Sequence, residues 1–295
     1  MAKGRIAINL EYAALCLLCT PLRAMPYGAA MGLADGLGWL LSCVFRFKRR
    51  RTLGRIRSVF PEKTSGECAF IARRSLQNFL RTVFEMVRAT KLTRGWMDRH
   101  VADGARYTEL LREVMSDGRG AVIMVPHSGN WYMAAWALAT YGQRIFAIAA
   151  RQRNPKIDAW MNRQYGAVDV LDRDNRRTLL QIRDRLRDGQ AFAILPDLRV
   201  RDPDVLVDFL GGRANVSRAG ATFAIKYGAP IVVAAMRRER GRHVFAHLAT
   251  LRPEGRTAED LTREVLGLLD GFIRQHPEDW FWYNKRWILE PVCDP

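Results

Sequence analysis

The segment AVIMVPHSGNWY, residues 121–132, sets the fold of this chain. Its first five residues are apolar and predict a short buried strand, and Pro126 and His127 follow directly after it. Small residues come next, and the pattern from Trp131 to Tyr141 predicts a helix. A strand, a tight turn and a helix in this order put His127 at the carboxyl end of a strand, the edge where open α/β sheets carry their functional groups.

The same alternation continues after this segment. Short apolar strands and amphipathic helices alternate from residue 104 onward, and most of the predicted helices stop at a glycine. We expect strands at residues 121–125, 144–150, 167–171, 191–195, 230–236 and 243–248, and helices at 107–117, 131–141, 155–165, 176–187, 217–227 and 257–276. This rhythm predicts an α/β fold in which a mostly parallel central sheet is flanked by helices.

The first 100 residues differ from the rest, and we expect a helical segment that associates with a membrane interface. The apolar runs at residues 12–22 and 29–47 are interrupted, by Pro21 and by Asp35, so neither matches the ~20 apolar residues of a spanning helix. A basic block at residues 48–57 follows, and such residues contribute about 1 kcal/mol each at an anionic leaflet. The alternative is a helical hairpin packed on the domain. We therefore divide the chain into a segment 1–100 and an α/β core 101–295, expected to form one integrated domain.

Residues 58–100 are predicted to be helical, with a broad apolar face. Ser65 and Cys68 would form only a weak capping box at the start. Glu85 falls beside the apolar face, and an exposed position explains it better than a buried one.

The composition limits the class of partner. The chain has 295 residues, 48% hydrophobic and 26% charged, with a formal net charge of +17, which predicts a globular protein with an anionic partner. Most of the 47 basic residues are arginine, which suits phosphate recognition but also follows from a GC-rich genome. The tryptophans 280, 282 and 287 cluster together instead of interleaving with arginines, so we expect no nucleic acid. An anionic membrane surface or an acidic protein remains.

Cysteine and histidine positions predict no metal site. The five cysteines form no disulfide pattern, which fits a reducing compartment, and Cys16 and Cys19 have no second pair to complete a metal site. Four histidines have no partner that the sequence identifies and are interpreted as structural: His100, His243, His247 and His276.

Residues that follow the predicted strands are expected to converge on one edge of the sheet: Pro126-His127, Arg151 with Arg153, Asp172 with Arg173, Pro196-Asp197 and Arg237-Arg238. A pair of His127 and Asp197 would be a general base held in one tautomer. Backbone N–H groups of the turn at Ser128, Gly129 and Asn130 would suit an oxyanion or a phosphate. Because neither a nucleophile elbow nor a glycine-rich phosphate loop is present, the pattern predicts base-assisted attack of a hydroxyl on an activated carbonyl.

The same residues resemble a known family. Residues 125–131, VPHSGNW, resemble the His-x4-acid block of the lipid A biosynthesis late acyltransferases, in the lysophospholipid acyltransferase superfamily, and most of all its phosphatidylinositol mannoside acyltransferases. Further segments resemble family landmarks in the same order: 59–62 (VFPE), Arg163 before Gly166, 194–197 (ILPD), 207–211 (VDFLG), 229–232 (APIV) and 280–287 (WFWYNKRW).

The resemblance implies a membrane-associated O-acyltransferase. It would move a fatty acyl group from acyl-CoA or an acidic acyl-carrier protein, its co-substrate, to a hydroxyl of a glycolipid or lysolipid acceptor, with no further cofactor. His127 would be the base, Asp197 its orienting acid, and Arg151 and Arg163 would hold the acceptor phosphate or the donor. The amino-terminal helices would lie on the cytoplasmic face of the inner membrane, as a peripheral or monotopic anchor.

Two positions depart from the family pattern. Tyr132 stands where the family has an acid five residues after the histidine, and Asn284 stands where it often has histidine. Tyrosine is neutral near pH 7 and cannot offset an imidazolium charge. Two interpretations follow: Asp197 supplies the acid while Tyr132 orients or shapes the site, or the chain is a degenerate member that binds lipid without turnover.

Overall fold

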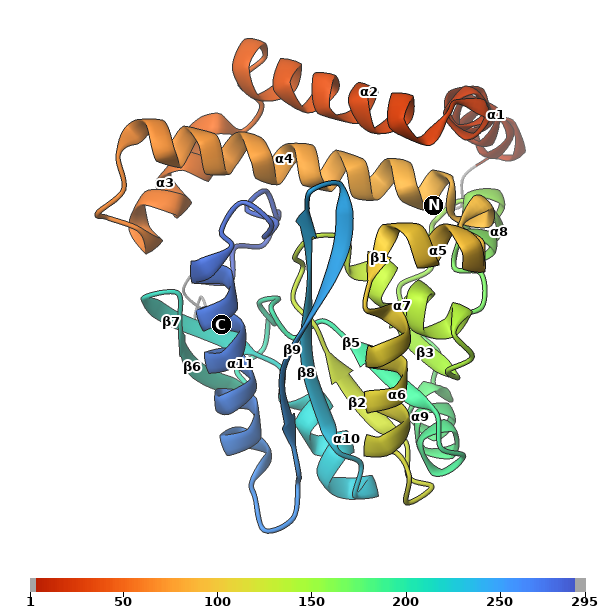
Figure 1. Ribbon diagram of the computed structural model, residues 1–295, viewed down its shortest axis with the longest axis vertical. Helices are drawn as coiled ribbons and strands as arrows, with labels where there is room; N and C mark the ends of the chain where they lie inside the picture. The colour runs from red at the N-terminus through yellow and green to blue at the C-terminus, as the bar shows by residue number, and fades with distance from the viewer. Residues whose placement is uncertain (1–3, 290–295) are drawn as a thin grey trace.

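The computed structural model describes residues 4–289. Its centre is a seven-stranded sheet in the order β1-β9-β8-β2-β5-β3-β4 (Figure 1). The bounds are β1 Val101–Ala102, β2 Ala121–Met124, β3 Ile145–Ala149, β4 Asp169–Asp172, β5 Ala191–Ile194, β8 Ile231–Glu239 and β9 Arg242–Leu251. All neighbours are parallel except β8 and β9, which form an antiparallel hairpin. The predicted α/β fold with a mostly parallel sheet is confirmed.

Helices cover both faces of the sheet because its strands are apolar on both faces. Along β2, Val122 and Met124 pack into one core cluster, while Ala121 and Ile123 pack into another. The first cluster includes residues of α9 (Thr178–Arg187), α10 (Ala219–Tyr227) and α11 (Ala258–Gln275). The second includes α5 (Arg94–His100), α6 (Gly104–Val114) and α7 (Trp131–Thr140), and α8 (Pro155–Gln164) lies against α1 (Arg5–Ala24).

A second, two-stranded sheet was not predicted from the sequence. Strands β6 (Val205–Phe209) and β7 (Gly212–Val216) form an antiparallel hairpin that contains the segment 207–211, which resembles a family loop. Its two turn residues, Leu210 and Gly211, both have positive φ, as the tightest hairpin turns require. The hairpin packs against α11.

The amino-terminal part is helical, as predicted. It comprises α1, α2 (Tyr27–Trp39), a π-helical turn at Leu40–Val44, α3 (Arg49–Val59) and α4 (Ser65–Val87). Figure 1 shows α4 lying across one end of the sheet, with α2 on top of it. The capping box is formed by Thr64 and Glu67, not by Ser65 and Cys68.

Helix α1 is longer than the apolar run that predicted it. Residues 5–11 continue the helix, and Pro21 lies in its last turn, so α1 has 20 residues and, by length and composition, suffices to cross a membrane. The paired segments 27–44 and 49–59 meet the same criterion together, with a bend of 91° between them. The expectation that neither amino-terminal run suits a spanning helix is therefore wrong for α1.

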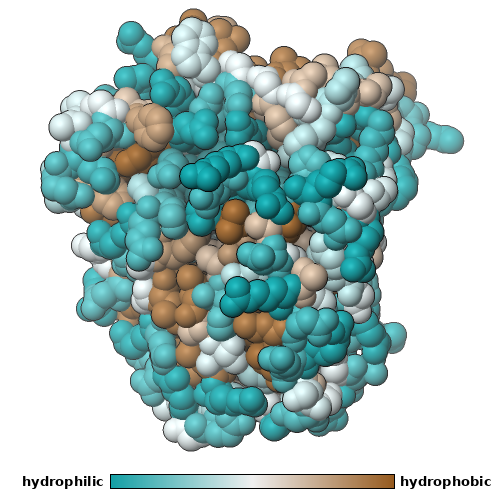
Figure 2. Space-filling view, viewed as in Figure 1, coloured by the Kyte–Doolittle hydropathy of each residue, from teal (hydrophilic) through white to brown (hydrophobic). Residues whose placement is uncertain are grey.

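The amino-terminal helices carry large apolar side chains that the rest of residues 4–289 leaves exposed. Leu17 is 78% exposed, Leu18 68% and Phe45 67%. Figure 2 shows apolar side chains along the upper edge of the molecule, where α1 and α2 lie. Exposed apolar surface of this kind marks an interaction site, and on a basic helical segment it indicates association with a membrane.

Candidate active site

His127 and Asp197 meet at the carboxyl edge of the sheet. Met124 pairs with Ile194 in the parallel register of β2 and β5, so residues three positions beyond each partner lie side by side. The Asp197 carboxylate accepts from the His127 backbone N–H at 2.7 Å and lies 2.8 Å from Nδ1 of its ring. The contact expected between the two residues is therefore present.

Asp197 is ionised although it is buried. Burial opposes its charge, but the His127 ring, the Trp280 indole and the His127 N–H hold the pKa of the carboxyl below its ordinary value. Trp280 Nε1 donates to Oδ2 at 2.8 Å, a contact that sequence reasoning did not predict. With Nδ1 directed to this carboxylate, Nε2 is the ring nitrogen that remains to accept a proton.

The turn after His127 is held by a segment from the far end of the chain. Ser128 bridges to Trp280, the Gly129 N–H donates to the carbonyl of Asp279 at 2.9 Å, and the Phe281 N–H donates to the carbonyl of His127 at 3.0 Å. Gly129 has φ +57°, and a Cβ there would lie 2.3 Å from the Met236 carbonyl oxygen, so only glycine fits.

Backbone N–H groups of this turn are used inside the protein. The His127 N–H binds Asp197, the Ser128 N–H binds the carbonyl of Pro126, and the Gly129 N–H binds that of Asp279. The expectation that Ser128 and Gly129 offer their N–H groups to an oxyanion or phosphate is not met. The side chains of Ser128 and Asn130 are also buried, and Asn130 caps α7 by accepting from the Met133 N–H.

Glu85 lies beneath the turn and is fully buried, contrary to the exposed position expected for it. Its carboxylate binds both terminal nitrogens of Arg238 and the ring of His243, which therefore has a partner. Burial opposes the Glu85 charge, but Arg238 and His243 lower the pKa of the carboxyl well below its ordinary value. Arg238, expected near the catalytic groups, instead neutralises this buried acid.

An apolar cavity of about 160 Å³ opens beside His127. Its walls come from α7, from β3, β4 and β5, and from Tyr165. Tyr132 lines it and stacks on Trp136 with ring centroids 5.7 Å apart. Burial raises the pKa of the Tyr132 hydroxyl, so this side chain is neutral at physiological pH and contributes shape, not charge.

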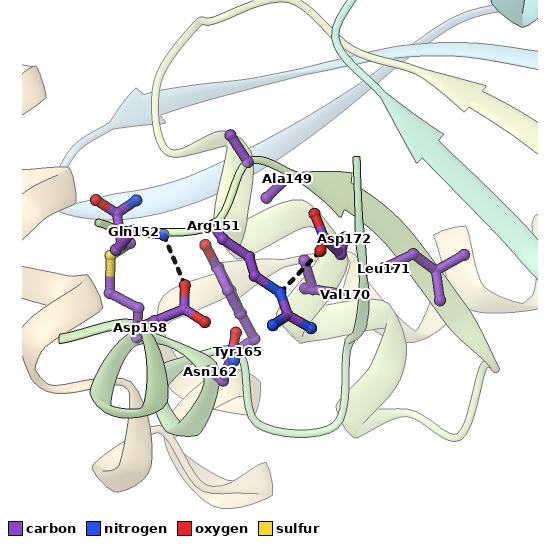
Figure 3. A pocket seen from close by; sticks show the side chains of 11 residues that line it. Ala149, Arg151, Gln152, Asp158, Asn162, Tyr165, Val170, Leu171 and Asp172 are labelled. Atoms are coloured by element: carbon purple, nitrogen blue, oxygen red, sulfur yellow. Dashed lines mark hydrogen bonds and ion pairs between the residues drawn. The ribbon is translucent and has the colours of Figure 1, made fainter. Parts of the chain in front are cut away.

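A polar hollow of about 90 Å³ lies next to this cavity, and Tyr165 lines both spaces. Figure 3 shows Arg151 reaching across this hollow toward Asp172, with Nε 2.8 Å from the carboxylate. The Arg151 side chain is 70% exposed. Arg163 lies nearby on α8 and is exposed, but it lines neither space.

Within residues 4–289, no group of three or more His, Cys, Asp or Glu side chains could hold a metal ion. Cys16 and Cys19 both lie on α1 as free thiols, and Cys293 falls outside the described residues.

Comparison with known proteins agrees with the motifs. Residues 6–288 match the family model described as bacterial lipid A biosynthesis acyltransferase. The phosphatidylinositol mannoside acyltransferase of Mycolicibacterium smegmatis is 27% identical over 97% of this chain and 95% of its own length. The corresponding protein of Mycobacterium tuberculosis is 25% identical over 82% and 77%. Lipid A biosynthesis acyltransferase 2 of Shigella flexneri is 28% identical over 52% of this chain and 48% of its own. Because the family model covers nearly the whole chain, this protein belongs to the bacterial lipid A biosynthesis acyltransferase family.

Proposed function

We propose that this acyltransferase moves a fatty acyl group from acyl-CoA or an acyl-carrier protein to a hydroxyl of a membrane glycolipid or lysolipid, with His127 as general base. The observation that carries the proposal is the contact of His127 Nδ1 with the buried Asp197, beside an apolar cavity. Two relatives are named for acyl transfer to phosphatidylinositol mannosides and for lipid A biosynthesis, which supports a glycolipid acceptor.

The proposed reaction needs one proton transfer in each direction. Nε2 of His127 takes the proton of the acceptor hydroxyl as its oxygen attacks the thioester carbonyl, and the ionised Asp197 stabilises the imidazolium that forms. The tetrahedral intermediate then breaks its carbon–sulfur bond, and His127 returns the proton to the leaving thiolate. N–H groups of Trp131 and Tyr132, in the first turn of α7, are the donors proposed for the oxyanion, because helix geometry leaves them without intrahelical acceptors.

The cavity suits the acyl chain, and the surrounding arginines suit an anionic group. Tyr132 would form part of the acyl wall, so Asp197 alone would supply the acid of the pair. Arg151 and Arg163 would bind a phosphate of the acceptor or of the donor from their exposed positions.

The exposed apolar surface of α1 and α2, with the basic residues of α3, supports a site at the cytoplasmic face of the inner membrane, bound in peripheral or monotopic fashion.

The test is transfer by purified protein from radiolabelled palmitoyl-CoA or palmitoyl-carrier protein to a phosphatidylinositol mannoside or lysophospholipid. We expect His127→Ala to abolish transfer and Asp197→Asn to reduce the rate on the order of 10⁴-fold, because the amide disturbs the tautomer of the base. His247→Ala is the matched control, since His247 lies on β9 and binds Thr250. Full activity of His127→Ala would overturn the proposal.

Tyr132→Asp in the same assay separates the two interpretations of the motif. Retained or raised transfer would show that the site works as a His–acid pair with Tyr132 as a wall. The alternative, a lipid-binding protein without turnover, predicts no transfer in the wild type and no change of the cellular lipid profile in a His127→Ala strain.

A further inference from the structure

The buried Glu85 carboxylate is contacted by four residues from four parts of the chain. From β8, Arg238 donates to both oxygens, at 2.9 and 2.6 Å. From β9, His243 Nε2 lies 3.0 Å from Oε1. The remaining two contacts come from Asn130, in the turn after His127, and from Tyr27 in α2. Because Arg238 already compensates the negative charge of Glu85, the hydrogen bonds from Asn130 and Tyr27 are not needed to stabilise that charge.

The contact of Glu85 with Asn130 fixes the turn after His127. Asn130 Nδ2 donates to Oε2 of Glu85 at 2.6 Å, and its Oδ1 accepts from the Met133 N–H, so the side chain is held at both ends. One turn before Glu85 on α4, the Thr82 hydroxyl donates to the carbonyl of Gly129 at 3.0 Å. Helix α4 therefore determines where the residues just after His127 lie.

The contact with Tyr27 joins this arrangement to the amino-terminal helices. The Tyr27 hydroxyl donates to Oε1 of Glu85 at 2.7 Å from the first residue of α2. Its ring packs edge-on against Trp96, with centroids 5.2 Å apart. On the same side, Arg88 donates to the carbonyls of Leu22 and Met25, where α1 ends and α2 begins. The corner between α1 and α2 is thus clamped onto α4.

We propose that Glu85 is a positioning residue that couples the α1–α2 corner, through Tyr27 and Asn130, to the placement of His127. Seating of the exposed apolar helices on a bilayer would then favour the arrangement of the turn in which His127 is ready to react. This inference rests on the proposed function only for the role of His127 as base. The coupling itself is a property of the contacts.

The variants are chosen so that folding survives. Glu85→Gln would leave the buried Arg238 charge uncompensated, which typically destabilises a fold strongly, so it is a poor test. Asn130→Ser removes the reach to Glu85 but keeps a good helix cap. Tyr27→Phe removes one hydroxyl. The matched control is Asp35→Asn, which breaks the ion pair of Asp35 in α2 with Arg81 in α4 and touches no residue of the turn.

The first readout is long-range ¹H–¹⁵N NMR of the histidine rings in the detergent-solubilised protein, with the His127 signals identified by their loss in His127→Ala. We expect Asn130→Ser to shift the Nδ1 and Nε2 signals of His127, Tyr27→Phe to shift them less in the same direction, and Asp35→Asn to leave them in place. Unchanged His127 signals in folded Asn130→Ser, or an equal shift in Asp35→Asn, would overturn the proposal.

The second readout is turnover with palmitoyl-CoA in detergent and on vesicles of phosphatidylglycerol and phosphatidylcholine. We expect kcat to fall about tenfold in Asn130→Ser with the KM for palmitoyl-CoA unchanged, and the stimulation by vesicles to be lost in Tyr27→Phe but kept in Asp35→Asn. Stimulation of Tyr27→Phe equal to that of the wild type would refute the coupling. If no form shows turnover but Asn130→Ser and Tyr27→Phe both move the His127 signals, the coupling stands and the proposed function fails.

Discussion

Asp279 has a buried carboxyl group and lies next to the turn after His127. Its backbone carbonyl accepts from the Gly129 N–H, and its side chain accepts from Asn78 Nδ2 at 2.9 Å. Burial, with the neighbouring Glu278, raises the pKa of the Asp279 carboxyl to about 7. The native protein therefore binds this proton more tightly than the unfolded chain does.

The raised pKa predicts a pH-dependent stability. Because the native state holds more protons than the unfolded state between the two pKa values, Asp279 contributes most below pH 4 and that contribution is lost as pH rises to about 7. We expect Asp279→Asn to gain stability relative to the wild type by roughly 2 kcal/mol between pH 5.5 and pH 8. Urea unfolding at a series of pH values measures this difference. Asp208→Asn, at a side chain that is 88% exposed, is the control, and an equal gain in that variant would contradict the prediction.

The position and the partners of a site residue could be predicted from the sequence for some residues and not for others. His127 and Asp197 could be paired in advance because each follows a strand and parallel strands end at a common edge. Glu85 could not be placed, because its burial depends on Arg238 and His243, which come more than 150 residues later. Its position beside the apolar face of a helix was the available signal. The hydrogen bond of Trp280 to Asp197 could not be predicted either, because these two residues are also far apart in the chain.

Among the elements, α4 supports both the site and the amino-terminal helices, so its start matters. Thr64 accepts from the Glu67 N–H, and Glu67 accepts from the Thr64 N–H, which satisfies two groups that a helix leaves unpaired. The sequence contains this Thr-x-x-Glu signature one position before Ser65, for which only a weak capping box is expected.

We expect Thr64→Ala to destabilise the protein by about 1 kcal/mol, as loss of an N-cap typically does. Denaturant unfolding followed by circular dichroism measures the change. Ser65→Ala is the neighbouring control, because the Ser65 hydroxyl accepts from Arg57 and caps nothing. An equal loss in both variants would contradict the assignment of the cap.

The hairpin of β6 and β7 shows how an element was missed. Val205, Val207 and Phe209 are buried while Leu206 and Asp208 are exposed, the alternation of a half-buried strand. This alternating pattern covers only five residues and overlaps the segment 207–211 that resembles a family loop, so the sequence alone does not predict a strand there. The helices of the core could be predicted because their periodicity extends over many residues and most of them stop at a glycine. The short parallel strands β2 to β5 could be predicted because each is an apolar run between two such helices.

On the scale of the whole molecule, apolar exposure is concentrated in one part of the chain. We expect Leu17→Glu with Leu18→Glu to weaken binding to anionic vesicles by tenfold or more, since burial of each leucine is worth roughly 1.5–3 kcal/mol. Vesicle co-sedimentation measures it. The matched control is Leu179→Glu with Leu180→Glu on α9, an exposed pair outside the amino-terminal helices. Equal losses in both double variants would argue against a defined membrane face.

Residues 279–281 contact the turn at His127, and these contacts determine when the active site can assemble during synthesis. Strands β2 and β5 supply His127 and Asp197 long before Trp280 has been synthesised. A nascent chain can therefore assemble much of its sheet while the hydrogen bonds that hold the turn and the Asp197 carboxylate are still missing. The site is completed by a segment that lies 83 residues beyond Asp197, so its assembly waits until all strands of the central sheet have been synthesised.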